Sequence, residues 1–309
     1  MKLFSLVLSL ALLWPCLTTA QWEQYFSEEE LARLDDLEDS ILLLAYAVVN
    51  DSLPEHRFGT CRELIPKLVK ALKTKNSFYY PFNQLKSISI QYPQDSSFRV
   101  FTWQLYVDVN DYRYFGAIQM NTPDLKLYPL VDRSFEVADV ENDLLTPDQW
   151  YGAVYYNLKQ VDSPQGRYYL LFGFDGYEFF RKRKVVDVLT FREDGTPLFG
   201  APVFINTEDE NQPPQKNRLM LEYSAETSVR LNYDELLEKI MFDHLIELNG
   251  SYGEGPTKFP DGSYEGYTLQ NGFWFYQSKI FDQVSDEPPR PHPILDERPK
   301  DLFGKKKGN

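Results

Sequence analysis

The stretch Arg167-Tyr-Tyr-Leu-Leu-Phe-Gly-Phe-Asp-Gly176, followed by Val185-Val-Asp-Val-Leu-Thr-Phe191, decides the fold. Both runs are rich in aromatic and β-branched residues, which favour strands. Asp194-Gly195 then precedes a third apolar run, and Asp-Gly in this position is a strong signal for a hairpin turn. The sequence therefore predicts the centre of a β-sheet here, with strands over 168–174, 185–191 and 198–205 and a short turn of helix over 178–184.

Outside this stretch, the hydrophobic period is 2 from Phe78 onward, as in strands. Turn residues separate the apolar runs at intervals of about ten residues, which is typical of antiparallel sandwiches and barrels. Helices that could connect parallel strands are missing from the pattern. Residues 249–266 are rich in Gly, Tyr and Pro and are interpreted as a loop. Further strands are expected over 85–92, 98–108, 112–120, 125–131, 151–161, 218–225, 228–233, 239–245 and 272–276.

The N-terminal part has a helical pattern instead. Ser27 and Glu30 form a capping box, and apolar residues then recur at helical spacing as far as Val48. A second helix is expected over 56–74, with Pro66 either marking its start or kinking it. The fold class is therefore mainly β (α+β): a helical hairpin over 21–76 and one large antiparallel sheet, sandwich or barrel-like domain over 77–284.

The N-terminal residues indicate export, and the C-terminal residues indicate a tail. Lys2 precedes an apolar run that is too short to span a bilayer, and small residues follow it up to Ala20, so residues 1–20 are interpreted as a signal peptide. We therefore expect a periplasmic or extracellular protein. Only Cys61 remains after cleavage, which excludes an intrachain disulfide. The Pro-rich, charged segment 285–309 is expected to be a flexible tail.

Composition and motifs exclude several functions. The formal net charge is −14, with 46 acidic residues, and a surface this acidic repels nucleic acids and anionic membranes. No segment of the mature chain is apolar enough to span a membrane. Phosphate-binding glycine loops and the G-x-S-x-G elbow are also missing from the sequence. Whether the protein is an enzyme stays open, because carboxylate pairs cannot be selected from so many acids.

Four segments resemble a group of secreted bacterial proteins of unknown function, and the resemblance covers roughly residues 98–282. It implies export but no activity, and no residue role follows from it. The segments are Arg218–Tyr223, Ile240-Met-Phe-Asp-His-Leu245, Phe259-Pro-Asp-Gly-Ser-Tyr-Glu-Gly-Tyr267 and Gly272-Phe-Trp274.

Asp243-His244 is the candidate pair most specific for catalytic chemistry, because a carboxylate beside an imidazole can orient a general base. Neighbours in a strand point to opposite faces, so the two share a site only if the strand bulges. Pro260-Asp-Gly-Ser263 resembles half of a calcium loop but lacks the full spacing, so at most a weak Ca²⁺ site is expected. Histidines and cysteines are too few for a zinc cluster, and no other cofactor is predicted.

Aromatic residues make up 16% of the chain and can either fill a core or stack on a ligand. We expect a ligand cleft where the Tyr-rich loop 251–267 meets Trp274. The candidate ligand-binding residues are therefore Asp243, His244, Asp261, Tyr264, Glu265 and Trp274.

Three functional hypotheses follow. The first is a non-catalytic, exported binding or envelope-associated protein whose ligand is a glycan, a peptide or another envelope component. The alternative is a hydrolase of extracellular polymers such as glycans, acting through carboxylates near Asp243 and Asp261. The third is a structural partner whose hairpin over 27–75 docks on another chain.

Overall fold

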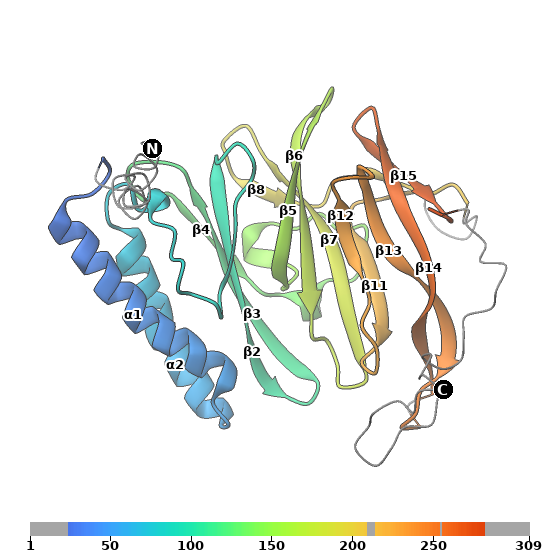
Figure 1. Cartoon of the computed structure of the whole chain (residues 1–309), viewed down its shortest axis with the longest axis horizontal. Helices are drawn as coiled ribbons and strands as arrows, with labels where there is room; N and C mark the ends of the chain where they lie inside the picture. The colour runs from blue at the N-terminus through green and yellow to red at the C-terminus, as the bar shows by residue number, and fades with distance from the viewer. Residues whose placement is uncertain (1–23, 209–213, 254, 282–309) are drawn as a thin grey trace, which may run out of the picture.

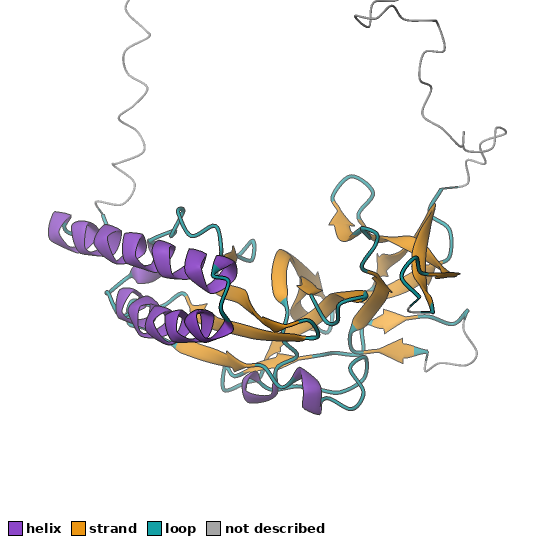
Figure 2. Cartoon of the chain, turned by 90° about the horizontal axis from the view of Figure 1, so that it is seen from below, coloured by secondary structure: helices purple, strands orange, loops and turns teal. Residues whose placement is uncertain are grey.

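The structure is a computed structural model that describes residues 24–208, 214–253 and 255–281. The predicted signal peptide (1–20) and tail (285–309) lie outside the described residues. Within them the protein is mainly β with two N-terminal helices, as predicted. The helices lie at one end of the molecule, and the sheets follow one another along it from there, as Figure 1 shows from one side and Figure 2 from below.

The two helices form the predicted hairpin. Helix α1 (Glu28–Asn50) begins with the capping box: Glu30 N–H bonds to the Ser27 hydroxyl, and the Glu30 carboxylate accepts from Ser27 N–H. Helix α2 (Pro54–Leu72) starts two residues earlier than expected and runs through Pro66. Neither helix, nor any other in the described part, is long and apolar enough to cross a membrane.

The strands form three sheets whose neighbours are antiparallel, except that β15 and β9 pair in parallel. The first sheet has the order β1 (Ser89–Gln91), β2 (Phe98–Asp108), β3 (Asp111–Met120), β4 (Leu127–Val131). The second has the order β11 (Leu219–Ser224), β7 (Arg181–Phe191), β6 (Gly166–Asp175), β5 (Val154–Ser163), with β8 (Pro197–Phe199) also paired to β7. The third has the order β10 (Gln215–Lys216), β9 (Phe204–Ile205), β15 (Phe273–Gln277), β14 (Pro256–Gln270), β13 (Lys239–Asn249), β12 (Leu231–Asp234).

Three hydrophobic cores separate the four layers. One lies between the helices and the first sheet, the next between the first and second sheets, and the last between the second and third sheets. The middle sheet is therefore buried on both faces. In β6, Tyr169 and Leu171 belong to the second core, while Leu170 and Phe172 belong to the third. Burial on both faces explains why 168–172 is continuously apolar instead of alternating.

Two details of the central stretch differ from the prediction. The helical turn expected over 178–184 is wrong: residues 181–184 begin β7, and their charged side chains are paired across the sheet, as Arg183 is with Glu222. The single strand expected over 198–205 is two strands, β8 and β9, which belong to different sheets. The chain changes sheets after Gly200, whose φ is +97°, a conformation that glycine adopts easily.

The loop expected over 249–266 is also wrong, because most of it is strand β14. Pro256 and Pro260 argued against a strand, since proline has no N–H for the ladder. Both residues pair with β13, whereas β15 pairs with β14 only at residues 266–270. The proline-bearing half of β14 is thus an edge, where a missing N–H is tolerated.

Candidate functional site

A wide cleft lies between the segment that follows α2 and strand β1. Its volume is about 660 Å³, within the usual range for ligand sites. Exposed side chains such as Asn83, Lys86 and Tyr92 form its rim. Aromatic, amide and aliphatic side chains line the rest of it: Gln24, Tyr25, Phe78, Tyr79, Pro81, Phe82, Leu85, Ile88, Ser89, Ile90, Gln91 and Ser96.

The aromatic rings of the cleft hold one another in place. Tyr25 and Tyr79 are stacked, with their centroids 3.8 Å apart and their planes within 10° of parallel. Phe78 stands edge-on to Tyr79 and to Tyr92, with a centroid distance of 5.8 Å in each case. These offset and T-shaped contacts are the favoured geometries for aromatic pairs. The cleft therefore presents fixed ring faces instead of loose side chains.

Arg99, on β2, supports the cleft from behind. The segment 77–82 begins with a short 3-10 helix, η1 (Ser77–Tyr79), in which Ser77 O accepts from Tyr80 N–H, and the rest of the segment lacks regular structure and needs further donors from elsewhere. The Arg99 guanidinium supplies them: Nη2 donates to Ser77 O at 2.9 Å and Nη1 donates to Tyr80 O at 2.7 Å. Nη1 also donates to the Tyr92 hydroxyl at 2.8 Å, and Nε donates to Gln119 Oε1. Arg99 thereby connects both sides of the cleft to the first sheet.

The charge of Arg99 has no direct counter-ion. Its side chain is 0% exposed, and no carboxylate of the described residues lies within ion-pair distance of it. Rings surround the guanidinium instead: Phe78, Phe82, Tyr92 and Phe101 have centroids 4.8–5.8 Å from Cζ. Burial lowers the pKa of Arg99 from its ordinary value, partly offset by Tyr92. A buried cation solvated by rings and carbonyls is costly and calls for a functional explanation.

Phe82 shows that the cleft wall is strained. Its φ is +53°, in the left-handed region that a bulky side chain rarely adopts. The ring is buried and packs edge-on against Tyr80, at a centroid distance of 4.8 Å. Packing therefore enforces the conformation. Strain of this kind is often found at binding sites.

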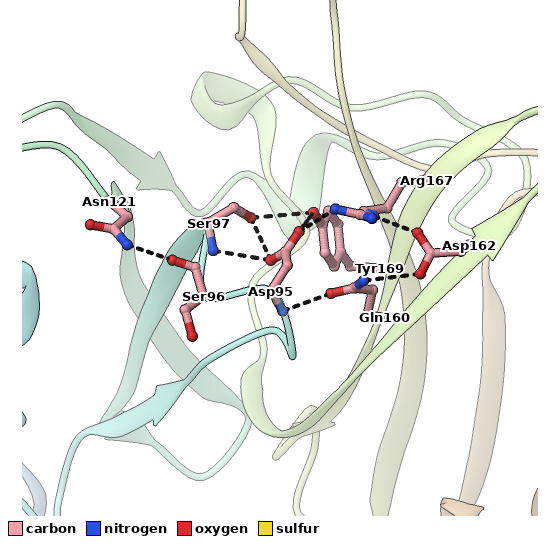
Figure 3. A network of polar contacts seen from close by, with 8 residues as sticks. All are labelled: Asp95, Ser96, Ser97, Asn121, Gln160, Asp162, Arg167 and Tyr169. Carbon is pink, nitrogen blue, oxygen red and sulfur yellow. Dashed lines mark hydrogen bonds and ion pairs between the residues drawn. The ribbon is translucent and has the colours of Figure 1, made fainter.

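A polar network anchors the opposite wall (Figure 3). Residues 92–97 connect β1 to β2, and Asp95 in this loop accepts from Arg167 Nη1 at 2.7 Å and from the Tyr169 hydroxyl at 3.0 Å. Ser97 donates to the same carboxylate through its N–H and its hydroxyl. Burial alone would raise the pKa of Asp95, but these hydrogen bonds from Ser97, Tyr169 and Arg167 lower it below its ordinary value. The wall that carries Ser96 is thus clamped to β5 and β6.

Of the predicted site residues, three come together on the third sheet. His244 contacts Glu265 through Nδ1, and its Nε2 lies 3.8 Å from Asp261 Oδ2. The ladder between β13 and β14 is irregular between Asp243 and Leu245, which is the bulge that such a contact needs. Hydrogen bonds from Ser263 lower the pKa of Asp261, and His244 adds to the effect. The group is an imidazole between two carboxylates on a partly exposed surface.

Asp243 has a different environment from this group. By register, Phe242 and Glu265 share one face of the ribbon, whereas Asp243 and Tyr264 share the other. The Asp243 carboxylate accepts from Arg230 N at 2.5 Å, on the side of β12. Asp243 and Asp261 therefore do not form the carboxylate pair that the hydrolase alternative requires.

The aromatic residues that line the observed cleft are not those near Trp274, where a cleft was predicted. Trp274 is 1% exposed and stands edge-on to Tyr233 in the third core. Tyr264 packs edge-on against Phe281, at a centroid distance of 6.0 Å. Trp274 is thus a core residue in this structure and offers no surface to a ligand.

The sequence contains a signal for the observed cleft, although none of the predicted site residues lies there. Residues Phe78-Tyr-Tyr-Pro-Phe82 form a dense aromatic run between a helix and a strand, and no acidic residue occurs between Glu63 and Asp95. In a chain with 46 acids, this gap marks an unusual surface. The position of segment 78–82 in the fold, however, depends on its contacts with β2 and β3.

Comparisons with known proteins add no assignment. The chain matches no protein-family model, and neither the curated proteins nor the solved structures contain a significant match. Within the described residues, no group of three or more His, Cys, Asp or Glu side chains could hold a metal ion. The functional argument therefore rests on the geometry of the cleft and of the His244 group.

Proposed function

We propose that this protein is an exported, non-catalytic binding protein of the periplasm or the extracellular space, and that the aromatic cleft holds its ligand, a saccharide chain. One observation carries the proposal. The cleft combines fixed aromatic faces with amide side chains, and none of the described residues that line it is acidic. A cleft without carboxylates in an acidic chain has a surface suited to binding, and the described residues of its lining lack the acid–base pair of a glycoside hydrolase.

The composition of the cleft fits a sugar. Pyranose rings have flat apolar faces that stack on aromatic rings, and hydroxyl groups at their edges. Tyr79 and Tyr92 supply ring faces, while Gln24, Asn83 and Gln91 supply amides that can both donate and accept. A site of this kind binds by stacking and orients its ligand by a few hydrogen bonds.

A peptide ligand fits less well. Peptides are often recognised by strand addition to a free sheet edge. The strand that lines the cleft, β1, has only three residues, Ser89–Gln91. The Ser89 side chain also donates to the Tyr155 carbonyl of β5, which lies alongside. The available edge is therefore short and partly covered.

The structure argues against the two other hypotheses. Asp243 and Asp261, the two carboxylates named in the hydrolase alternative, lie in separate environments, since Asp243 accepts from Arg230 N whereas Asp261 and Glu265 flank His244. The docking hypothesis required a hairpin free of its own sheet, but α1 and α2 pack on β2 through residues such as Ile41, Leu64 and Phe101.

Titration of the full exported chain with neutral and acidic oligosaccharides, followed by calorimetry, tests the proposal. Binding should weaken about tenfold in Tyr79→Ala, since a stacked ring contributes roughly 0.5–1.5 kcal/mol beyond its buried area. Tyr46→Ala serves as the matched control, because Tyr46 is an exposed tyrosine at the far end of α1. Binding of short peptides alone, or equal binding by both variants, would contradict the proposal.

A further inference from the structure

We propose that the cleft selects acidic saccharides, in which the sugar rings carry carboxylate or sulfate groups. This inference rests on the proposed function and adds the charge of the ligand to it. Three observations support it: the uncompensated charge of Arg99, the cationic rim residue Lys86, and the exclusion of carboxylates from the surrounding stretch of chain.

Arg99 places a positive charge directly behind the stacking surface. Its Cζ lies 5.5 Å from the ring centroid of Phe78 and 5.8 Å from that of Tyr92, and both rings line the cleft. Phe78 is only 4% exposed, so the accessible face is that of Tyr92, and a ligand stacked about 3.5–4.0 Å beyond it would lie roughly 9 Å from the charge. With an effective dielectric constant of about 20, this favours one negative group on the ligand by on the order of tenfold.

The Tyr92 hydroxyl connects the Arg99 guanidinium to the rim of the cleft by a hydrogen bond. Because it accepts from Arg99 Nη1 at 2.8 Å, its own proton is left to point elsewhere. Tyr92 is 38% exposed, so this proton can be donated to a ligand at the rim. A donor backed by a guanidinium suits an anionic oxygen better than a neutral one.

Lys86 is the only charged residue among the described residues that line the cleft. It is exposed, and it forms no ion pair with another described residue. Lysines also occur at 67, 70, 73 and 75, in the stretch between Glu63 and Asp95 that lacks acidic residues. This stretch of the sequence is thus positively charged within a protein of net charge −14, while Lys75 lies near Glu30 of α1.

The nearest carboxylates are engaged away from the cleft. Asp35 and Glu38 accept from the Tyr80 hydroxyl, and Glu38 also accepts from Gln84 N, on the side of the segment that faces α1. Asp95 is held by Arg167 and Ser97. None of the three belongs to the lining, so a bound acidic group would meet donors and cations first.

The experiment compares trimers of similar size that differ in charge: a galacturonate trimer, a sulfated galactose trimer, a neutral galactose trimer and a cationic glucosamine trimer. Each is titrated into the full exported chain at 20 mM and at 500 mM salt. We expect one or both acidic trimers to bind about tenfold more tightly than the neutral one, the cationic trimer to bind most weakly, and the preference to shrink at high salt. The two acidic arms distinguish carboxylate from sulfate.

Lys86→Gln should weaken binding of the acidic trimer about two- to fivefold and leave binding of the neutral trimer unchanged, as expected for an exposed ion pair. Lys279→Gln removes the same charge from an exposed position beyond β15 and should change neither. Equal or tighter binding of the neutral or cationic trimer, or no effect of Lys86→Gln, would overturn the charge preference while leaving the proposed function intact. If no trimer binds, both fail.

Discussion

Two arginine side chains of the described structure have no exposed surface, and they are neutralised in different ways. Arg218 lies in the core between the first and second sheets, with its Nε 2.9 Å from Asp187 Oδ1. Arg99 lies behind the cleft and contacts carbonyls, a hydroxyl, an amide and rings, but no carboxylate. The charge of Arg218 is neutralised by Asp187 within the core. The charge of Arg99 has no carboxylate partner among the described residues, and in the proposed function it favours an anionic ligand.

The largest effect expected from this difference is on stability at Arg218. Arg218→Met leaves Asp187 buried without its cation, and burial already raises the pKa of that carboxyl despite Arg218. We expect a loss of about 3–5 kcal/mol in the free energy of unfolding, measured by urea denaturation.

The double variant Arg218→Met with Asp187→Leu is the control for this prediction. It removes both charges, so it should recover most of the lost stability. A loss below about 1 kcal/mol in the single variant would show that the pair is not the neutralising contact in the core.

Arg99→Met should cost less, about 1–3 kcal/mol, because it takes a hydrogen-bond donor from the Tyr80 carbonyl but leaves no opposite charge behind, and Ser77 O keeps its bond from Tyr80 N–H. The same denaturation experiment measures it. In contrast to Arg218→Met, it should also reduce the preference for acidic over neutral trimers to about the two- to fivefold share expected from Lys86. A larger stability loss than in Arg218→Met would indicate a buried carboxylate partner for Arg99.

Lowering the pH should have a smaller effect, on the stability of the loop 92–97. The pKa of Asp95 is lowered in the folded protein, so its contribution to stability is complete above the ordinary carboxyl value and is lost as the pH falls through the folded value, below about pH 4. We expect acid to loosen the 92–97 wall before the core. Amide hydrogen exchange of Ser96 and Ser97 between pH 6 and pH 3, corrected for intrinsic rates, measures this.

Asp95→Asn provides the comparison for the acid experiment. It removes the titrating carboxylate, so the protection of this loop should be lower at pH 6 and should then change little toward pH 3. Equal pH dependence in both proteins would assign the effect to another group.

The smallest effect is expected at the third sheet. His244→Gln breaks the contacts with Glu265 and Asp261, which lie at a partly exposed surface, and should change stability by less than about 1 kcal/mol. Saccharide binding should be unchanged in calorimetry, since His244 does not line the cleft. A loss of binding equal to that of Tyr79→Ala would move the binding site to this sheet.

The central strands could be predicted because their signal is local. Residues 168–172 are apolar on both faces, and Asp194-Gly195 specifies a turn whatever surrounds it, with Gly195 at φ +80°. Strand β14 could not be predicted in the same way. Whether Pro256 and Pro260 are tolerated depends on which strand is absent beside them, and this is a property of the assembled sheet.

The same distinction applies to the sites. His244, Asp261 and Glu265 lie on the two strands of one hairpin, so a bulge was enough to bring them together. The cleft instead depends on Arg99, in strand β2, reaching both Gln119 on the neighbouring strand and Ser77 in the segment that follows α2, outside the sheet. Segment 77–82 has no periodic pattern, and a single arginine in an apolar strand does not reveal what it will contact. Composition pointed to this region, but only the packed structure shows the cleft.

The most direct test is a crystal structure of the protein with an acidic trimer bound at low salt. The account predicts that the sugar rings stack on Tyr79 and Tyr92, with an acidic group within about 4 Å of Lys86 Nζ, as in an ion pair. A trimer seated instead against His244 and Glu265 on the third sheet, or a cleft left empty at saturating ligand, would contradict it.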